Sequence, residues 1–290
     1  MSERLLAEIS CDGDEKIGYG HIRRSLTLMT QLERDGFDVR VKGLSERARR
    51  WLPIPKFPGR TTDIQIFDLP CGINEQIQAA QMAGQMTVAL DWFGETLPDV
   101  NIAVYPHGEV RGLRKVYHGF EYVLIREEVA LLRRSPEVHG SKRVVVVLGG
   151  GDLLGQGHEA ACHLCRQGLE VILVQGPLAN KRGSGEGYEV LINPSNLPQL
   201  LASTDWVVTN GGGCMFEAMC LGKATVVLPQ TETEMRIARF AKDRDALLGI
   251  GLDCLHLFQA TELEKIAERG FELIDGRGAS RVSAIIRDLV

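Results

Sequence analysis

The chain has few aromatic residues, no long apolar run and no excess of basic charge. Aromatic residues make up 6% of its 290 residues, and 33 lysines and arginines stand against 38 aspartates and glutamates, a net charge of −5. Because no face is expected to be strongly basic, the composition argues against a nucleic-acid-binding protein. No apolar run approaches the roughly 20 residues that cross a bilayer, so we expect no membrane span either.

The amino terminus and the cysteines both predict a cytoplasmic location. The first residues, MSERLLAEIS, lack the basic segment and long apolar core of a secretion signal. The seven cysteines are scattered and odd in number, which favours a reducing compartment over a disulfide framework. Cys162 and Cys165 are spaced C-x-x-C, as in zinc sites, but no second ligand pair follows, and the segment has the period of an amphipathic helix. We predict no metal site.

Three common catalytic signatures are also absent. The sequence has no G-x-x-x-x-G-K-[ST] loop, no G-x-G-x-x-G fingerprint and no G-x-S-x-G elbow. A nucleoside triphosphatase, a dehydrogenase and an esterase therefore have no support from these motifs.

What the sequence does contain is a regular alternation of short apolar runs and amphipathic stretches. This alternation predicts the α/β class, with parallel sheets covered by helices on both faces. The polar segment around residues 135–142 is the best linker candidate. We therefore predict two doubly wound, Rossmann-like domains facing a cleft, at residues 1–134 and 143–290. A last strand of the first domain is expected at residues 122–125, and the C-terminal helix at 282–289 is expected in the second domain.

The segment CDGDEKIGYGHIRRS, residues 11–25, joins the first apolar run to a helical stretch. Gly18 and Gly20 allow a sharp turn, and the unpaired N–H groups at the start of the next helix suit an anion such as phosphate. His21 lies at that point, and imidazole is the side chain that titrates nearest neutrality. We interpret the segment as a place for proton transfer beside a phosphorylated substrate. The alternative is an ordinary turn with a surface histidine.

A catalytic imidazole is commonly oriented by a carboxylate. Asp12 and Asp14 precede the histidine loop, and we take Asp12 as the catalytic partner. Asp68, Asp91 and His107 end or follow strands of the first half and are weaker candidates of the same kind.

Two glycine clusters follow apolar runs in the second half. In NGGGCMFE, residues 210–217, phosphate oxygens can approach the backbone N–H groups, and Glu217 suits a ribose diol unless it is simply a solvated helix residue. In LGGGD, residues 148–152, the glycines either line phosphates or form a tight turn in which Asp152 caps the next helix. The nucleotide- and phosphate-binding residues that we predict are Gly18, Tyr19, Gly20, Gly150, Gly151, Asn210, Gly211, Gly212, Gly213, Cys214, Met215 and Glu217.

The segment QTETE, residues 230–234, offers hydroxyls and carboxylates to a sugar or ribose. It also reads as a helix start, with Thr231 as N-cap and Glu234 completing a capping box, and both interpretations can hold. Trp92 and Phe93 either form an apolar wall for a sugar ring or pack in the core. The substrate-binding residues that we predict are Arg24, Gln230, Glu232, Thr233 and Glu234.

The string D-G-x-x-x-I-G-x-G-H-x-x-R-x-L, residues 12–26, resembles the N-terminal signature of the PseG-type nucleotide-sugar hydrolases. Residues 209–229 are similar to the nucleotide-binding segment of that family, which MurG-like glycosyltransferases share loosely. The resemblance implies a GT-B architecture with UDP held mainly by the second domain. It also implies release of a free 2,4-diacetamido-trideoxy sugar for nonulosonic acid synthesis, with water activated by His21 and the ribose bound by Glu217.

We therefore expect a metal-independent hydrolase of a UDP-linked acetamido deoxy sugar, with UDP as product and no cofactor. The chain departs from the family pattern at Thr233, where the family carries asparagine, and at residues 22–25. These departures leave the sugar and the choice between hydrolysis and transfer open. A small GT-B glycosyltransferase and a non-catalytic nucleotide-sugar-binding protein are the alternatives.

Overall fold

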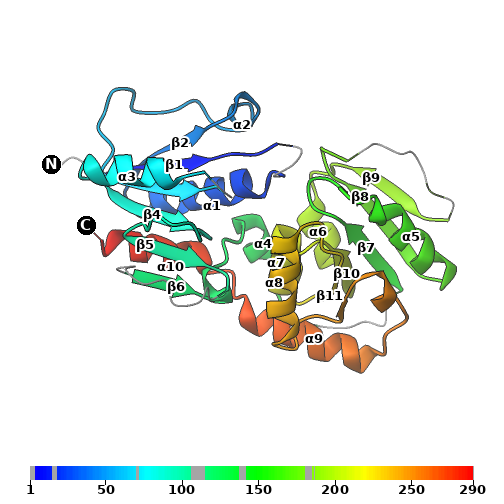
Figure 1. Cartoon of the computed structure of the whole chain (residues 1–290). Helices are drawn as coiled ribbons and strands as arrows, with labels where there is room; N and C mark the ends of the chain where they lie inside the picture. The colour runs from blue at the N-terminus through cyan, green and yellow to red at the C-terminus, as the bar shows by residue number, and fades with distance from the viewer. Residues whose placement is uncertain are drawn as a thin grey trace. The chain divides into compact units, whose positions relative to one another are not determined.

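The computed structural model describes residues 4–14, 18–69, 72–105, 115–136, 142–179, 185 and 187–289. Strands and helices alternate along the chain, which divides into two compact units (Figure 1). The first unit comprises Met1–Leu124 and Arg277–Val290, and the second comprises Ile125–Gly276. Among the described residues, no helix has the length and apolar character needed to cross a membrane.

The sheet of the first unit is parallel, with six strands in the order β2-β1-β3-β4-β5-β6. The chain passes from β1 to β2 on one side and then returns to place β3 on the other side of β1. The strand order therefore reverses between β1 and β3, and in open α/β sheets ligands bind at the carboxyl ends beside such a reversal. The strands are β1 (Leu6–Cys11), β2 (Asp38–Gly43), β3 (Ile64–Asp68), β4 (Met86–Leu90), β5 (Val100–Ala103) and β6 (Lys115–His118).

Both faces of this sheet are covered, because alternate side chains of a strand point to opposite faces. Ile64 and Ile66 of β3 belong to the core that α1 (Gly20–Arg34) and α10 (Gly278–Arg287) also enter. Phe67 lies on the other face and packs with side chains of α3 (Asn74–Met82). Burial on both faces explains why β3 is apolar along most of its length. The remaining helical elements of the unit are α2 (Glu46–Arg49) and the 3-10 turn η1 (Phe120–Tyr122).

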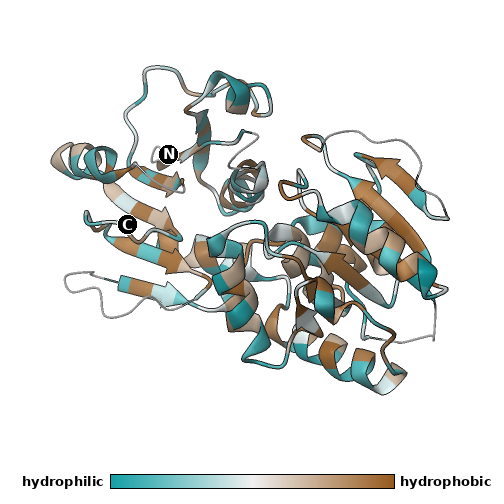
Figure 2. Ribbon diagram, turned by 45° about the vertical axis from the view of Figure 1, so that its right-hand side comes forward, coloured by the Kyte–Doolittle hydropathy of each residue, from teal (hydrophilic) through white to brown (hydrophobic). Residues whose placement is uncertain are grey.

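The sheet of the second unit is also parallel, in the order β12-β11-β10-β7-β8-β9, and its order reverses between β7 and β10. Figure 2 colours its strands mostly brown and its helices in brown and teal, as expected for buried strands and amphipathic helices. The strands are β7 (Arg143–Val147), β8 (Glu170–Gln175), β9 (Glu189–Ile192), β10 (Trp206–Thr209), β11 (Ala224–Val227) and β12 (Gly249–Ile250). The helices are α4 (Glu127–Leu132), α5 (Gln156–Arg166), α6 (Leu197–Ala202), α7 (Gly213–Cys220), α8 (Glu232–Lys242), α9 (Ala260–Leu273) and the 3-10 turn η2 (Leu252–Cys254).

The predicted class, α/β with doubly wound parallel sheets, is confirmed. The compact units differ from the predicted domains at both ends, however. The first unit ends at Leu124 rather than at residue 134, and it regains the chain from Arg277 onward. The physical reason is that α10 packs on α1, where Val282 and Ile286 join the core and the Ser283 hydroxyl donates to Asp35 (2.6 Å).

The strand expected at residues 122–125 is wrong. The last strand of this sheet is β6 (Lys115–His118), and residues 120–122 form the turn η1. Val123 and Ile125 are buried, as their apolar character predicted, but they are buried outside the sheet. The backbone here packs closely on α10, because a Cβ on Gly278 would lie 2.0 Å from the carbonyl oxygen of Val123.

Candidate functional site

The histidine loop leads directly into α1. Gly18 has a φ of +76°, in the region that favours glycine, and its N–H donates to the carbonyl of Asp14 (2.8 Å). Tyr19 is the N-cap, and among the described residues no side chain caps the helix. The backbone N–H groups at Gly20 and His21 therefore begin the helix as the anion-site hypothesis requires.

His21 contacts a carboxylate of a neighbouring strand. Its Nδ1 lies 2.7 Å from Oδ1 of Asp68, the last residue of β3. The contact spans the reversal between β1 and β3, because His21 follows β1. An ionised carboxylate only accepts hydrogen bonds, so we assign the proton to Nδ1. Nε2 of the neutral imidazole is then the nitrogen with a free lone pair, and it can take a proton from water.

Asp68 is fully buried and accepts hydrogen bonds from three side chains. Besides His21, Nε of Arg24 lies 2.7 and 2.9 Å from its two oxygens, and the Ser25 hydroxyl donates to Oδ2 (3.0 Å). Burial raises the pKa of Asp68, but the positive charge of Arg24 and the hydrogen bonds from His21 and Arg24 outweigh burial and lower it to about 2. The carboxylate is therefore ionised at neutral pH.

Arg24 joins Asp68 to a second carboxylate. Its Nη1 lies 2.5 Å from Oδ2 of Asp91, the residue after β4, and its Nη2 lies 3.3 Å from Nδ1 of His21. Burial lowers the pKa of Arg24, and the two carboxylates raise it by more. Asp91 has a φ of +50°, rare for a residue with a side chain, and its Oδ1 accepts from the backbone N–H of Val104 (3.0 Å). Arg24, predicted to bind substrate, is thus occupied in holding two carboxylates.

Asp12, predicted as the catalytic partner, has other contacts. Its carboxylate accepts from the hydroxyl and backbone N–H of Ser45 (2.5 and 3.3 Å), and Ser45 in turn caps α2. Asp12 therefore ties the β1 loop to the loop after β2. The structure assigns the histidine contact to Asp68, which the sequence offered only as a weaker candidate. His107, another weaker candidate, lies outside the described residues.

The glycine clusters of the second unit lie at the ends of β7 and β10, on either side of its strand reversal. Gly149 has a φ of +63° and lies against the side chain of Asn210, so the two loops touch. The Asp152 carboxylate accepts from the backbone N–H groups of Gln156 and Gly157 (2.9 and 2.7 Å). The capping interpretation of Asp152 is confirmed.

Gly150 and Gly151 lie against the loop that follows β8. The carbonyl of Gly150 accepts from the N–H of Leu178 (2.8 Å). A Cβ on Gly176 would lie 2.4 Å from that same carbonyl oxygen, and one on Gly151 would lie 3.1 Å from Leu178. The backbone approach explains the glycines here without a ligand.

The side chain of Glu234 packs against the loop at residues 210–213 and accepts hydrogen bonds from it. Its carboxylate accepts from Nδ2 of Asn210 (2.5 Å), from the N–H of Gln230 (2.7 Å) and from the backbone of Gly211 and Thr231. Burial raises the pKa of Glu234, and these hydrogen bonds oppose the rise. The Thr231 hydroxyl accepts from the N–H of Glu234 (3.2 Å), so the predicted N-cap of α8 is confirmed.

The other residues of the QTETE segment have simpler surroundings. The Gln230 side chain accepts from the N–H of Leu154 (3.0 Å) and so links the β11 and β7 loops. Glu232 is exposed and pairs with Arg236 one turn later (2.7 Å), and Thr233 is also exposed.

Glu217 lies on α7 and is 7% exposed. The guanidinium of Arg126 holds both of its oxygens, at 2.7 and 2.8 Å. Each oxygen keeps a second lone pair, so the carboxylate can still accept hydrogen bonds from the two hydroxyls of a ribose. Gly212 is the N-cap of α7, and no side chain caps it in the described part of the chain. Gly213 and Cys214 open the helix, whereas the predicted contact Met215 has its side chain fully buried in the core.

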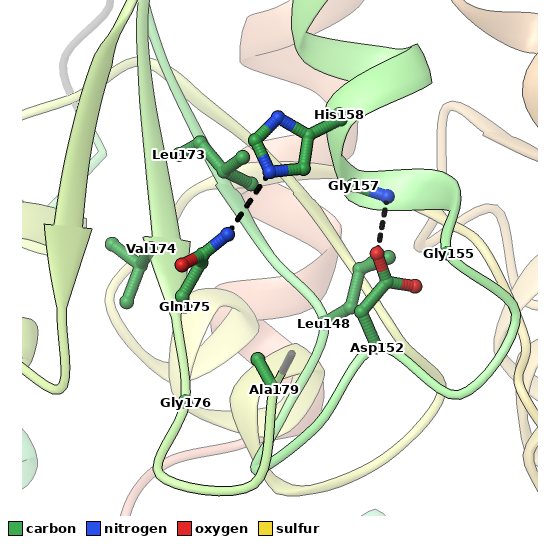
Figure 3. Close-up of a pocket in the computed structure, with 10 residues that line it drawn as sticks. All are labelled: Leu148, Asp152, Gly155, Gly157, His158, Leu173, Val174, Gln175, Gly176 and Ala179. Atoms are coloured by element: carbon green, nitrogen blue, oxygen red, sulfur yellow. Dashed lines mark hydrogen bonds between the residues drawn. The ribbon is translucent and has the colours of Figure 1, made fainter. Parts of the chain in front are cut away.

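A pocket that the sequence did not predict lies between the loop after β7, the start of α5 and the end of β8 (Figure 3). Its volume of about 60 Å³ exceeds the ~10–15 Å³ that one ordered water needs. Figure 3 shows Gln175, the last residue of β8, directed at His158 (3.0 Å), and His158 also contacts the Tyr188 hydroxyl (2.6 Å). Cys162 lies on the same helix, α5, as the helical interpretation of the C-x-x-C spacing predicts.

Phe93 and Trp92 follow β4 and differ in burial. Trp92 is 7% exposed and packs in the core beside α3, as the core-packing alternative predicts. Phe93 is 37% exposed and stacks on Tyr105, with ring centroids 5.6 Å apart.

No family model matches the chain. One curated relative is the spore coat polysaccharide biosynthesis protein SpsG of Bacillus subtilis, 24% identical over 215 residues that cover 66% of this chain. The match spans only 62% of the length of SpsG. The sequence similarity thus links the chain to a polysaccharide biosynthesis protein without covering that protein's whole length.

Solved structures resemble the chain over nearly its whole length. MurG of Acinetobacter baumannii has a TM-score of 0.68 at 13% identity, covering 99% of this chain and 100% of that one. The S. aureus MnaA–UDP complex has a TM-score of 0.62 at 12% identity, covering 99% and 97%. The calicheamicin glycosyltransferase CalG4 has a TM-score of 0.63 at 12% identity, covering both chains fully. The chain has the GT-B fold, with two Rossmann-like domains.

Proposed function

We propose that the chain hydrolyses a UDP-linked acetamido deoxy sugar, as PseG-type enzymes do, for nonulosonic acid or surface polysaccharide biosynthesis. The observation that carries this proposal is the contact between His21 and the buried, ionised Asp68 at the end of β3 (2.7 Å). The SpsG similarity and the GT-B fold, found also in a UDP complex, support a nucleotide-sugar substrate.

The chemical step requires only one base. Nε2 of His21 removes a proton from water, the water oxygen bonds to the anomeric carbon, and the bond from that carbon to the UDP oxygen breaks with its electron pair. Asp68 keeps the other nitrogen protonated and stabilises the imidazolium that forms. General base catalysis of this kind is worth typically 10²- to 10⁴-fold. UDP is already a good leaving group when helix N-termini and backbone N–H groups stabilise its charge.

The second unit supplies the nucleotide site in this proposal. The uncapped start of α7 offers backbone N–H groups to the phosphates, and Glu217 offers lone pairs to the ribose. Glu234 partly fills the loop at residues 210–213, so phosphate binds at the remaining N–H groups of that helix end.

A glycosyltransferase that uses the same donor is the second candidate. The observation that favours it is the fold similarity to MurG and CalG4, the latter named as a glycosyltransferase. In that case His21 would deprotonate an acceptor hydroxyl instead of water.

The test measures release of UDP and free sugar from a panel of UDP-sugars without an acceptor. We expect release by the wild-type protein and its loss in His21→Gln. His256→Gln, which removes an exposed histidine of the second unit, is the matched control and should retain activity. Turnover that requires an acceptor would support transfer, and binding without turnover would support a non-catalytic protein. Release that survives His21→Gln would refute the assigned base.

A further inference from the structure

A basic segment follows β2, an edge strand of the first sheet. Residues 46–60, ERARRWLPIPKFPGR, contain five lysines and arginines and one glutamate, in a chain where acidic residues outnumber basic ones by 38 to 33. The segment consists of α2 and the loop after it, which Figure 1 shows on the outer side of the first unit, beyond β2. The composition of the whole chain predicted no strongly basic face, and this segment is a local exception.

Four basic side chains of the segment are exposed, at Arg47, Arg49, Arg50 and Lys56. Two glutamates lie beside them: Glu46 is 3.4 Å from Arg50, and Glu33 is 2.9 Å from Lys56. Exposed ion pairs of this kind are weak, so an anion of another molecule can replace the glutamate as partner. The guanidinium of Arg49 donates to the backbone carbonyls of residues 43 and 44, which carry no net charge. The surface of the segment is therefore net positive.

Large apolar side chains are exposed within the same segment. Ile54 is 89% exposed and Trp51 is 50% exposed, whereas the other two tryptophans, Trp92 and Trp206, are 7% and 3% exposed. Trp51 packs on Tyr19 with ring centroids 4.9 Å apart, which fixes the indole in place and leaves half of it in water. Exposed apolar groups rimmed by charge commonly mark a surface of interaction.

The backbone of the segment is suited to an apolar environment. Pro53 and Pro55 flank Ile54, and Pro58 follows shortly after. Proline has no backbone N–H, and burying an unpaired N–H away from water is costly. This loop therefore carries fewer donors that need a partner than an ordinary loop of its length. Proline also fixes φ, so the loop has less conformational freedom to lose when it binds.

We propose that the basic segment docks the first unit onto an anionic phospholipid surface. Trp51 and Ile54 enter the headgroup region, where tryptophan is typically found, and the basic side chains contact lipid phosphates. A second copy of the chain fits this surface less well, since two such segments would bring like charges together. Duplex DNA would supply phosphates but no apolar environment for Ile54. The proposal goes beyond the proposed function and does not depend on it.

The first test is cosedimentation of the full chain with lipid vesicles. One set is phosphatidylcholine alone, and the other contains equal parts of phosphatidylcholine and phosphatidylglycerol. We expect binding to the anionic vesicles alone, and its loss as salt rises from about 0.1 to 1 M, because the Debye length falls from about 10 to 3 Å. Equal binding to both sets or binding to neither would overturn the proposal, as would binding to duplex DNA or self-association in place of vesicle binding.

The second test removes the apolar contact. Ile54→Ser should lower the partition coefficient for anionic vesicles by roughly 3- to 10-fold. Met82→Ser is the matched control, because Met82 is also 89% exposed and lies on α3, within residues 61–110, which contain no lysine or arginine. Its partition coefficient should equal that of the wild type. An equal loss in the two variants would refute a role of Ile54 in docking.

The third test removes one positive charge at a time. Arg50 and Arg236 each follow a glutamate by one turn in an exposed ion pair, at 3.4 and 2.7 Å. Arg50→Gln should weaken vesicle binding by roughly 5-fold, the effect of one basic residue near an anionic surface. Arg236→Gln changes the net charge equally but lies in the second unit, and its binding should match the wild type. Equal losses would show that net charge, and not the basic segment, determines binding.

Tryptophan emission tests whether the segment enters the lipid. Because Trp51 is the half-exposed tryptophan, vesicle binding should shift the emission to the blue, and Trp51→Phe should remove that shift while the protein still sediments with vesicles. Sedimentation of the wild type without a shift would overturn insertion. Urea denaturation checks that each variant is folded, and the exposure of Ile54 and Arg50 predicts midpoints equal to that of the wild type. None of these measurements requires turnover, so their outcome is independent of UDP release.

Discussion

Replacing Asp68 by asparagine tests the catalytic assignment at its buried centre. The asparagine side chain has nearly the same size, so the change removes a charge and one acceptor oxygen without opening a cavity. In the wild-type protein that carboxylate receives hydrogen bonds from His21, Arg24 and Ser25. After the substitution, one of the two acceptor oxygens is replaced by an amide N–H₂ group, which is a donor and cannot accept from the donors that face it.

The expected loss of activity follows from the histidine proton. Asp68 fixes that proton on Nδ1, and without the carboxylate the tautomer with the proton on Nε2 becomes available. A base that is protonated at the reacting nitrogen cannot act, so kcat should fall by about 10²- to 10⁴-fold, the range of general base catalysis. KM should change little, because neither group binds the nucleotide in the proposed function.

The same substitution should also destabilise the fold. Breaking a buried ion pair by removing one partner typically costs about 3–5 kcal/mol. We expect the lower end, about 3 kcal/mol, because the Arg24 side chain is 25% exposed and keeps Asp91 as a partner. Urea denaturation measures this loss, and the kinetic assay must be run below the new midpoint.

The control for a purely structural effect is Asp35→Asn. Asp35 lies at the opposite end of α1 and accepts from the Ser283 hydroxyl (2.6 Å), so its replacement should cost about 1 kcal/mol and leave kcat unchanged. If Asp68→Asn is destabilised as expected but keeps kcat within about threefold, Asp68 does not orient the base. A change in KM alone would equally refute the reasoning.

Three further predictions follow from particular contacts. The pKa of Asp68 is lowered from 3.8 to about 2, so its contribution is present above pH ~4 and is lost as the pH falls toward 2. Wild-type protein should lose about 2 kcal/mol of unfolding free energy over that range that Asp68→Asn does not lose, as urea titrations at several pH values would show. Arg126→Met removes the guanidinium that donates to both oxygens of Glu217, so the free energy of unfolding should fall by about 3 kcal/mol. The affinity for UDP, measured by calorimetry, should fall as well. Gly176→Ala puts a Cβ 2.4 Å from the carbonyl oxygen of Gly150, so urea denaturation should show a loss of about 1–3 kcal/mol.

Matched variants separate these effects from general sensitivity to mutation. Arg236→Met removes the arginine of an exposed ion pair, with side chains 55% and 80% exposed, and stability should change by less than about 1 kcal/mol. Gly213→Ala adds a Cβ that meets nothing within 4 Å, so wild-type stability is expected. A loss in Gly213→Ala equal to that in Gly176→Ala would show that close packing is not the cause.

The fold class could be predicted because buried parallel strands are continuous apolar runs. The run at residues 144–148 became β7 (Arg143–Val147), and the alternation of elements held along most of the chain. The sixth strand of the first sheet could not be found this way. Three of the four residues of β6 (Lys115–His118) are exposed, since it is an edge strand, and its neighbour 122–125 carries the apolar residues instead.

The return of the C-terminal helix could not be predicted from local pattern. An amphipathic stretch shows which of its faces is buried but not which sheet buries it. Val282 and Ile286 could pack on any apolar surface, so they do not identify the sheet that they cover. The hydrogen bond between Ser283 and Asp35 joins residues 248 positions apart in the sequence.

The partner of His21 was misjudged because proximity along the chain was taken as proximity in space. Asp12 is nine positions from His21 by number, yet its carboxylate turns to Ser45, while Asp68 is 47 positions away and contacts the imidazole. In a parallel sheet the carboxyl ends of neighbouring strands meet at one edge, so an acidic residue that ends a buried strand is the stronger candidate. Asp91 also follows a buried strand, and both carboxylates meet the guanidinium of Arg24. Applying that rule to every strand end would have ranked Asp68 and Asp91, the two carboxylates of the network, above Asp12.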